Sequence, residues 1–299
     1  MQRVFMGCFL FSTAIAAVMV GGWIFPLILG YACTRGGNEF VAMAQAKGYK
    51  PSVKIVRGMI ISFFVLTAIP HLPGVNDLPQ DFAINHFPIL FTVGICLSFI
   101  RLLLRSEKPT ATIADIASTI MGFIYVGWMP AHLVLLRDLY PIGYELIANP
   151  MQQAGVAYLW TSFVIIFGTD VAAYYSGKTF GKHKLYPEVS PKKTVEGAIG
   201  GLIASVFLAT AVVYASDNFV FSQPPFQSNL IHAPLLGFVV SLAAQLGDLC
   251  ESLMKRDAGV KDSSDAIPGH GGFLDRGDSM LFGGPIAYYW IKVVVLGIL

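Results

Sequence analysis

Residues 233–256 read APLLGFVVSLAAQLGDLCESLMKR, an apolar run that ends in a cluster of charges. Four polar residues near its end recur at i, i+3, i+4 and i+7, namely Asp248, Glu251, Ser252 and Lys255. This spacing places them along one side of a helix, with leucines on the other side. Because charges at the end of a membrane-like segment are costly, they usually mark a functional site. The stretch therefore predicts a membrane helix with a chemically active polar end.

The composition of the whole chain agrees with a membrane protein. Of its 299 residues, 55% are hydrophobic and only 13% are charged, whereas a soluble domain has about 25% charged residues. The net charge of +2 and the lack of a basic tail argue against a nucleic-acid partner. The 4 cysteines are scattered without a C-x-x-C pair, which favours small core residues over a disulfide framework or a zinc site.

Apolar runs predict the fold class. A helix that crosses a bilayer needs about 20 apolar residues. Nine such runs occur, at 4–20, 22–45, 55–70, 84–103, 111–136, 152–176, 196–215, 232–254 and 281–298. Hydrocarbon cannot satisfy open backbone hydrogen bonds, so we expect nearly all of this backbone to be helical. The predicted fold is an all-α polytopic membrane protein with about nine transmembrane helices.

The basic residues predict the orientation of these helices. With nine spans, nearly all of the 20 Lys and Arg residues lie on the side of the N-terminus. The exceptions are Arg35 and Lys292, which fall inside spans, and Arg137 at a far end. By the positive-inside rule, the N-terminus and the basic loops are expected to be cytoplasmic.

A second polar cluster lies at residues 170–197. Asp170 and Tyr174 follow helical spacing at the end of the sixth span, where they are weaker site candidates. Gly177-Lys178-Thr179 resembles the end of a P-loop, but Ala172 stands where its first glycine would be and no strand precedes it. Ser190-Pro191 is expected to start a helix. Lys192, Lys193 and Thr194 would then lie at a helix N-terminus, which favours an anion.

Two interpretations of the basic loops are open. The lysines can face anionic lipid headgroups and simply fix the topology, as expected for Lys47, Lys50, Lys54, Arg101 and Arg105. In residues 178–193 and 255–276, however, basic residues alternate with glycine, hydroxyl and carboxylate residues, which favours a phosphate site. Asp248 and Asp275 beside such lysines can hold Mg²⁺, although two simple salt bridges would also explain them.

At these residues the chain resembles the CDP-diacylglycerol synthase family, also called phosphatidate cytidylyltransferases. The family's terminal signature is met by Ser252, Lys255, Arg256, Lys261, Asp262, Pro268, His270, Gly271, Gly272, Asp275, Arg276 and Asp278. The upstream blocks at Ser190–Thr194, Glu196-Gly197, Gln245 and Gly247-Asp248 are similar too. The resemblance is strong over the C-terminal half, and over the N-terminal half it is limited to the hydropathy plan.

The resemblance implies the reaction of CTP with phosphatidate to give CDP-diacylglycerol and diphosphate. It implies Mg²⁺ on Asp248 and Asp275, with a second cation left open. The other implied roles are phosphate binding or catalysis for Lys192, Lys193, Lys255, Arg256, Lys261 and Arg276; polar contacts for Ser190, Thr194, Ser252 and His270; and support for Glu196, Glu251, Asp262 and Asp278.

The resemblance also predicts the surroundings of the protein. It implies a homodimer in a bacterial inner membrane, with the active site facing the cytoplasm. Residues 1–150 would be scaffold helices with oligomer contacts. Residues 151–299 would form the catalytic region, with cytoplasmic loops at 177–195 and 255–280.

Three other functions are weighed against this one. A secondary transporter for an anionic solute predicts an internal repeat and charges near mid-bilayer, and the sequence displays neither feature. A CTP-dependent polyprenol kinase has a hydroxyl acceptor and would need a general base. A CDP-alcohol phosphotransferase would need its aspartate-rich helix motif, which does not occur in this chain.

Overall fold

A computed structural model describes residues 12–75, 78–105, 112–141, 149–227, 230–267, 269 and 271–298. The chain divides into two compact units, each described by itself. Unit 1 comprises residues 1–135 and 254–277, and unit 2 comprises residues 136–253 and 278–299. Residues 254–277, from the region predicted to be catalytic, thus group with the N-terminal helices.

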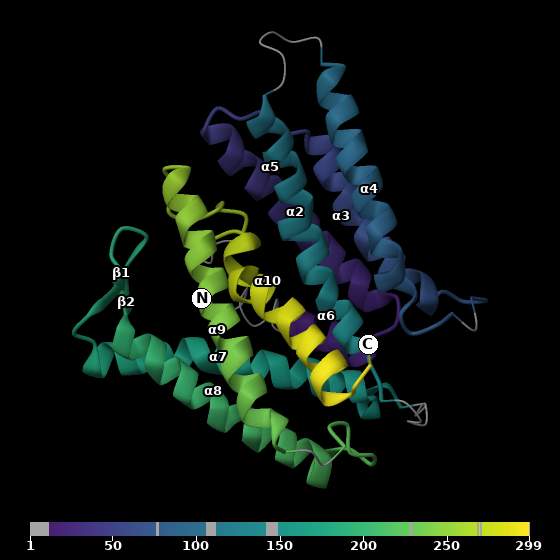
Figure 1. Cartoon of the computed structure of the whole chain (residues 1–299), viewed down its shortest axis with the longest axis vertical. Helices are drawn as coiled ribbons and strands as arrows, with labels where there is room; N and C mark the ends of the chain where they lie inside the picture. The colour runs from purple at the N-terminus through teal and green to yellow at the C-terminus, as the bar shows by residue number, and fades with distance from the viewer. Residues whose placement is uncertain are drawn as a thin grey trace. The chain divides into compact units, whose positions relative to one another are not determined.

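Unit 1 is a helical bundle (Figure 1). Residues 12–20 are helical, and the helices that follow are α2 (Ile24–Ala46), α3 (Val53–Ala68), η1 (Ile69–His71), α4 (Phe82–Leu103), α5 (Ile113–Phe123), η2 (Ile124–Trp128) and α6 (Met129–Arg137), which runs on into unit 2. Phe63 of α3 is fully buried, and its ring centroid lies 5.3 Å from that of Phe87 and 5.5 Å from that of Phe91, both in α4. Edge-on and tilted ring pairs of this kind join α3 to α4.

Unit 2 contains most of the remaining elements. They are η3 (Pro150–Gln152), α7 (Ala154–Phe180), β1 (Lys184–Tyr186), β2 (Ser190–Thr194), α8 (Val195–Ala215), η4 (Ser216–Val220), α9 (His232–Asp257), α10 (Leu274–Tyr289) and η5 (Trp290–Val295). Helices α9 and α10 begin or end in residues assigned to unit 1. The helical assignment of α9 confirms the spacing that aligns Asp248, Glu251, Ser252 and Lys255.

Small residues bring α7, α8 and α9 close together. A Cβ on Gly201 of α8 would lie 3.0 Å from the carbonyl oxygen of Thr169 in α7. A Cβ on Gly237 of α9 would lie 2.8 Å from the Cβ of Ala209 in α8. The hydroxyl of Thr169 also donates to Ser241 of α9 at 2.9 Å. Such close backbone approach is typical of helices that pack in a membrane.

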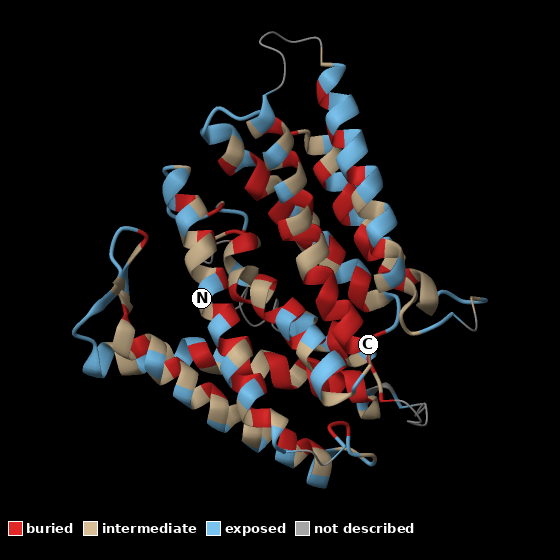
Figure 2. Cartoon of the chain, viewed as in Figure 1, coloured by how far each residue is buried: buried red, intermediate tan, exposed pale blue. Residues whose placement is uncertain are grey.

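Six described helices are long and apolar enough to cross a membrane: Val53–His71, Phe82–Leu103, Ile113–Arg137, Ala154–Phe180, Val195–Val220 and His232–Asp257. The all-α membrane class is therefore confirmed at this level. The span Val195–Val220 is the most apolar of them, and only 22% of it is buried. Figure 2 shows mostly exposed residues along α4 and mostly intermediate residues, with exposed ones between them, along α8. Exposed apolar helix faces of this extent fit contact with lipid.

The expected helix start at Ser190-Pro191 is wrong. Residues Ser190–Thr194 form strand β2, which pairs antiparallel with β1 so that Lys184 faces Thr194 and Tyr186 faces Ser190. The helix begins at Val195, and the Thr194 side chain caps it by accepting from the Gly197 N–H at 3.1 Å. Pro191 is tolerated because an edge strand does not need every N–H. The lysines therefore lie on a hairpin rather than in a helical turn.

The close packing of α8 and α9 leads to a prediction. Gly237→Ala should lower the free energy of unfolding by about 1–3 kcal/mol, because the added methyl overlaps the backbone of Ser205 and the side chain of Ala209. Thermal unfolding of the purified protein in detergent measures this change.

Gly58→Ala is the matched control, because a Cβ there meets nothing within 4 Å and Gly58 lies inside helix α3. It should be neutral or stabilising by about 0.5–1 kcal/mol, from helix propensity alone. Equal effects of the two variants would contradict the packing argument.

Candidate active site

An ion pair joins two of the sequence blocks in unit 2. Lys193 lies on β2 and Asp248 on α9, and the Lys193 Nζ is 2.6 Å from the Asp248 Oδ2. Their side chains are 29% and 26% exposed, so the pair is reachable from solvent. The Ser252 hydroxyl, one turn along α9, lies 3.4 Å from the Asp248 Oδ1. The structure thus brings together a lysine and a carboxylate that are 55 positions apart in the sequence.

Asp170 of α7 belongs to the same group. It interacts electrostatically with both Asp248 and Lys193. Two carboxylates around one lysine leave a net negative charge, which favours a further cation. Asp170 thus lies close enough to Lys193 and Asp248 to interact with both.

Hydrogen bonds hold the start of the hairpin that carries Lys193. The Glu196 carboxylate accepts from the backbone N–H groups of Lys182 and His183 and lies 2.6 Å from the His183 Nδ1. Beyond the hairpin, the Gln245 side-chain amide of α9 donates to the carbonyl of Ala198 in α8 at 3.3 Å. Glu196 therefore ties the start of the hairpin to the start of α8.

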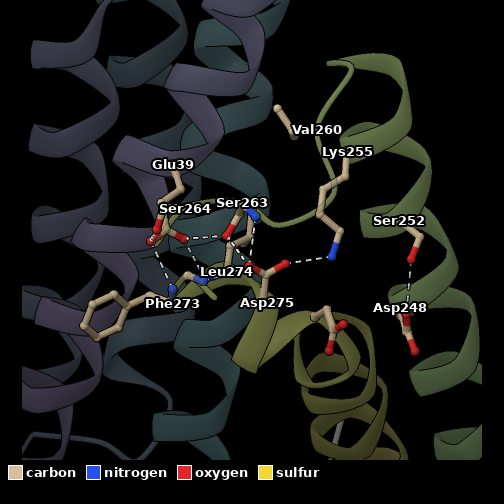
Figure 3. A network of polar contacts seen from close by, with 12 residues as sticks. Glu39, Asp248, Ser252, Lys255, Val260, Ser263, Ser264, Phe273, Leu274 and Asp275 are labelled. Atoms are coloured by element: carbon tan, nitrogen blue, oxygen red, sulfur yellow. Dashed lines mark hydrogen bonds and ion pairs between the residues drawn. The ribbon is translucent and has the colours of Figure 1, made fainter. Parts of the chain in front are cut away.

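A second polar group lies in unit 1 and centres on Glu39 of α2. This side chain is only 6% exposed. Its carboxylate accepts from the Phe273 N–H at 3.0 Å, the Leu274 N–H at 2.8 Å, the Ser263 hydroxyl at 2.9 Å and the Ser264 hydroxyl at 2.6 Å. Figure 3 shows these contacts converging on one carboxylate. Because Leu274 starts α10, Glu39 also places a negative charge at the positive end of that helix.

Asp275 holds the same loop from the other side. Its Oδ1 lies 2.7 Å from the Lys255 Nζ, and its Oδ2 accepts from the N–H groups of Ser263 and Gly272 and from the Ser263 hydroxyl (Figure 3). Burial raises the pKa of Asp275, but the bonds from Lys255, Gly272 and Ser263 outweigh it and lower the pKa to about 2. The carboxylate is therefore ionised at neutral pH, and it fixes the end of Lys255 in one position.

Gly272 is required where these two carboxylates meet. A Cβ at this position would overlap the hydroxyl of Ser263 and the carboxylate of Glu39. The Ser263 hydroxyl lies between Glu39 and Asp275, and its single proton can serve only one of them at a time. The signature glycine thus allows a very tight polar cluster.

The other predicted residues are placed as follows. Ser190 lies on β2 and Thr194 caps α8, as described above. Arg256 donates to the carbonyl of Val260 at 3.1 Å. Glu251 is fully buried, and the Asp278 carboxylate accepts from the Ser279 N–H at 2.6 Å. The side chains of Tyr174, Lys192, Lys261, Asp262 and Arg276 are exposed. His270 lies outside the described residues.

Glu39 and Ser263 were missed by the sequence analysis. Glu39 sits in the second apolar run, which was assigned to the scaffold. A carboxylate inside such a run is itself a signal, because burying it without donors is very costly. Its donors are more than 220 positions away in the sequence. The sequence could therefore indicate that Glu39 needs hydrogen-bond donors, but it could not identify them.

Comparison with known proteins identifies the family. Residues 1–294 match the model of the cytidylyltransferase family. The chain is 33% identical, over 98% of its length and 97% of the relative, to a phosphatidate cytidylyltransferase of Synechocystis sp.. It is 37% identical, with the same coverage, to a phosphatidate cytidylyltransferase of Bacillus subtilis. A chloroplastic phosphatidate cytidylyltransferase 4 of Arabidopsis thaliana is 32% identical over 92% of this chain and 69% of that protein. The chain therefore belongs to the cytidylyltransferase family.

The Glu39 cluster leads to a second prediction. Glu39→Gln should lower the free energy of unfolding by about 1–3 kcal/mol, because the amide turns one acceptor oxygen into a donor that faces other donors. Enzymatic turnover should fall as well, since the 263–275 loop loses one of the two carboxylates that hold it. Thermal unfolding and turnover of the same preparation test both effects.

Asp265→Asn is the control, because it removes an exposed carboxylate from the same loop. We expect its unfolding temperature to stay within the error of the unchanged protein. A Glu39→Gln variant as stable as this control would show that the four hydrogen bonds contribute little.

Proposed function

We propose that this protein is a phosphatidate cytidylyltransferase, which transfers a cytidylyl group from CTP to phosphatidate and releases diphosphate. Membership of the cytidylyltransferase family and the names of the long, full-coverage relatives support this function. The structural observation that carries it is the contact between Lys193 and Asp248, which joins the two signature blocks of unit 2.

The chemistry requires neutralisation of charge more than a strong base. A phosphate monoester is already an anionic nucleophile near neutral pH, and the difficulty is to bring it up to a triphosphate. The Lys193 side chain is partly exposed, so its ammonium can contact phosphate oxygens. If a metal cation binds Asp248, it would replace Lys193 as the partner of that carboxylate and leave the ammonium available for a phosphate. Lys255 is held rigid by Asp275, which would pre-organise its charge for a phosphate.

The described carboxylates of unit 2 fit Mg²⁺. Mg²⁺ is commonly bound through one or two carboxylates together with substrate phosphates and waters. Asp170 and Asp248 offer such a pair, and the described residues contain no cluster of three or more His, Cys, Asp or Glu. Bound Mg²⁺ would shield the phosphate charges and polarise the α-phosphate for attack. The resident Lys193 ammonium would then shift from Asp248 towards a phosphate.

Asp275 remains the second predicted metal ligand. In unit 1 both of its oxygens already accept hydrogen bonds, so Lys255 or the loop donors would have to move for Asp275 to bind a cation. A positioning role for Asp275 needs no such rearrangement. The two roles differ in their effect on the magnesium requirement, which an experiment can separate.

The finer topology also belongs to this proposal. We propose nine spans with a cytoplasmic N-terminus, of which the six apolar helices are part. The basic hairpin and the 255–276 loop would then face the cytoplasm, where CTP is available, in a bacterial inner membrane. A homodimer is proposed from the family resemblance alone.

The direct test is an assay of the purified protein with CTP, phosphatidate and Mg²⁺ in mixed micelles. We expect equal amounts of diphosphate and CDP-lipid, and no product when any one component is omitted. Release of CDP with phosphorylation of a lipid alcohol would instead indicate a kinase and would overturn the proposal.

Asp248→Asn should reduce turnover by about 100-fold or more, because it removes one of the two carboxylates proposed to hold Mg²⁺. Its residual activity should need more Mg²⁺ for half-saturation. Glu188→Gln, which changes an exposed carboxylate in the turn of the same hairpin, should leave both values unchanged.

Asp275→Asn separates the two roles of Asp275. If Asp275 only positions Lys255 and the loop, the variant lowers the unfolding temperature and leaves the half-saturating Mg²⁺ concentration unchanged. If Asp275 is a metal ligand, the variant raises that concentration.

Two adjacent lysines provide a matched pair. Successive side chains of a strand point to opposite faces, and Lys193 contacts Asp248 while Lys192 is exposed. Lys193→Gln should therefore reduce kcat/KM by about 10–100-fold, and Lys192→Gln by clearly less. Equal losses would contradict the assignment of Lys193 as the principal phosphate contact of the hairpin.

A further inference from the structure

Unit 1 contains a pocket whose lining residues lie outside the two polar groups described above. Its volume is about 370 Å³, and it lies where the loop before α3 meets the end of α4. Four basic residues line it, namely Lys50, Lys54, Arg101 and Arg105. None of them belongs to the signature blocks. A volume of this size is within the range of ligand pockets, which is about 300–1,000 Å³.

The lining of the pocket is strongly positive. No acidic side chain is among the described residues that line it. Asp115 lies behind the pocket and is only 5% exposed. Its carboxylate accepts from the N–H groups of Lys50 and Thr112 and lies 4.0 Å from the Arg105 guanidinium. The described lining of the pocket therefore holds four cationic side chains, and Asp115 contacts Lys50 through its backbone and Arg105 through its guanidinium.

Backbone contacts give the pocket a fixed wall. The Arg105 guanidinium donates to the carbonyl of Lys50 at 3.2 Å, which ties the end of α4 to the loop before α3. The N–H of Ser52 donates to the hydroxyl of Thr119 in α5 at 3.0 Å. Lys54 and Arg101 are exposed and stand at the rim of this framework. The pocket is thus a formed feature of unit 1, and its two rim cations can reach a ligand.

The apolar part of the pocket indicates an amphiphilic ligand. The pocket lies at the start of the candidate span Val53–His71 and at the end of Phe82–Leu103, which is where a membrane span meets water. Leu104 lines the pocket and is 70% exposed, and the neighbouring Leu103 is 79% exposed. A soluble anion could bind the four cationic side chains but would make no apolar contacts with the exposed leucines. A phospholipid uses both, because its phosphate and its acyl chains are adjacent.

We propose that this pocket binds the headgroup phosphate of an anionic phospholipid. The phosphate is held by Lys54 and Arg101, with Lys50 and Arg105 behind them, and the acyl chains lie along the exposed leucines at the end of α4. Anionic lipid near a membrane surface gains about 1 kcal/mol for each Lys or Arg. Loss of two such residues should therefore weaken binding by about tenfold or more.

The test compares two double variants that lose the same charge. Lys54→Gln/Arg101→Gln removes the rim of the pocket. Lys47→Gln/Arg57→Gln removes two other basic residues of unit 1, neither of which lines it. Each full-length protein is reconstituted in nanodiscs or detergent and titrated with phosphatidylglycerol or with phosphatidylcholine. Native mass spectrometry counts the bound lipids, and thermal unfolding reports the stabilisation that each lipid gives.

The unchanged protein and the Lys47/Arg57 variant are expected to retain phosphatidylglycerol in preference to phosphatidylcholine. The Lys54/Arg101 variant should lose this preference by about tenfold or more, while its unfolding temperature in lipid-free detergent stays the same. The single variant Lys54→Gln should give an intermediate loss and serves if the double variant does not fold.

Three results would overturn the proposal. The first is equal lipid preference in both double variants, and the second is equal binding of the two lipids by the unchanged protein. The third concerns the source of the phosphate: if millimolar inorganic phosphate stabilises the unchanged protein as much as phosphatidylglycerol does, and the Lys54/Arg101 variant loses this stabilisation, the pocket serves a soluble phosphate rather than a lipid.

Discussion

A carboxylate that is buried in an apolar helical protein must be surrounded by donors, and this constraint organises unit 1. Glu39 accepts four hydrogen bonds, two from backbone N–H groups and two from serine hydroxyls. Leaving such a charge unsatisfied would cost far more than any single packing contact returns. The loop that contains Ser263 and Gly272 is consequently tied to α2, a helix from the opposite end of the sequence. The start of α10 is fixed by the same contacts.

Asp275 extends this constraint to Lys255, a residue of the family signature. One oxygen of Asp275 accepts hydrogen bonds from the loop, and the other contacts the Lys255 ammonium. Because Glu39 stabilises the same loop, it indirectly helps to hold this lysine of α9 in place. A charge that is oriented before the substrate arrives needs little reorganisation during the reaction. The N-terminal helices therefore do more than anchor the protein, because one of them supports part of the signature.

In unit 2, by contrast, charged side chains are brought together without being fully buried. The hairpin β1–β2 projects Lys193, and close packing of α7, α8 and α9 through small residues brings Asp170 and Asp248 into the same group. The side chains of Lys193 and Asp248 keep partial access to solvent. Elsewhere the exposed surface of α4 and α8 is largely apolar, which suits hydrocarbon (Figure 2). The polar group and the apolar surface thus lie on different elements of the chain.

The sequence by itself determined the membrane class, most helix positions, the polar stripe of α9 and the family signature, because hydropathy and helical spacing are local properties. It did not determine that residues 190–194 form a strand, since a serine-proline pair is compatible with either a helix start or an edge strand and only pairing with Lys184–Tyr186 decides between them. Nor could it show that Lys193 meets Asp248 or that Glu39 holds the 263–274 loop. Those contacts depend on which helices pack together, and packing follows from the whole set of side chains rather than from any one stretch.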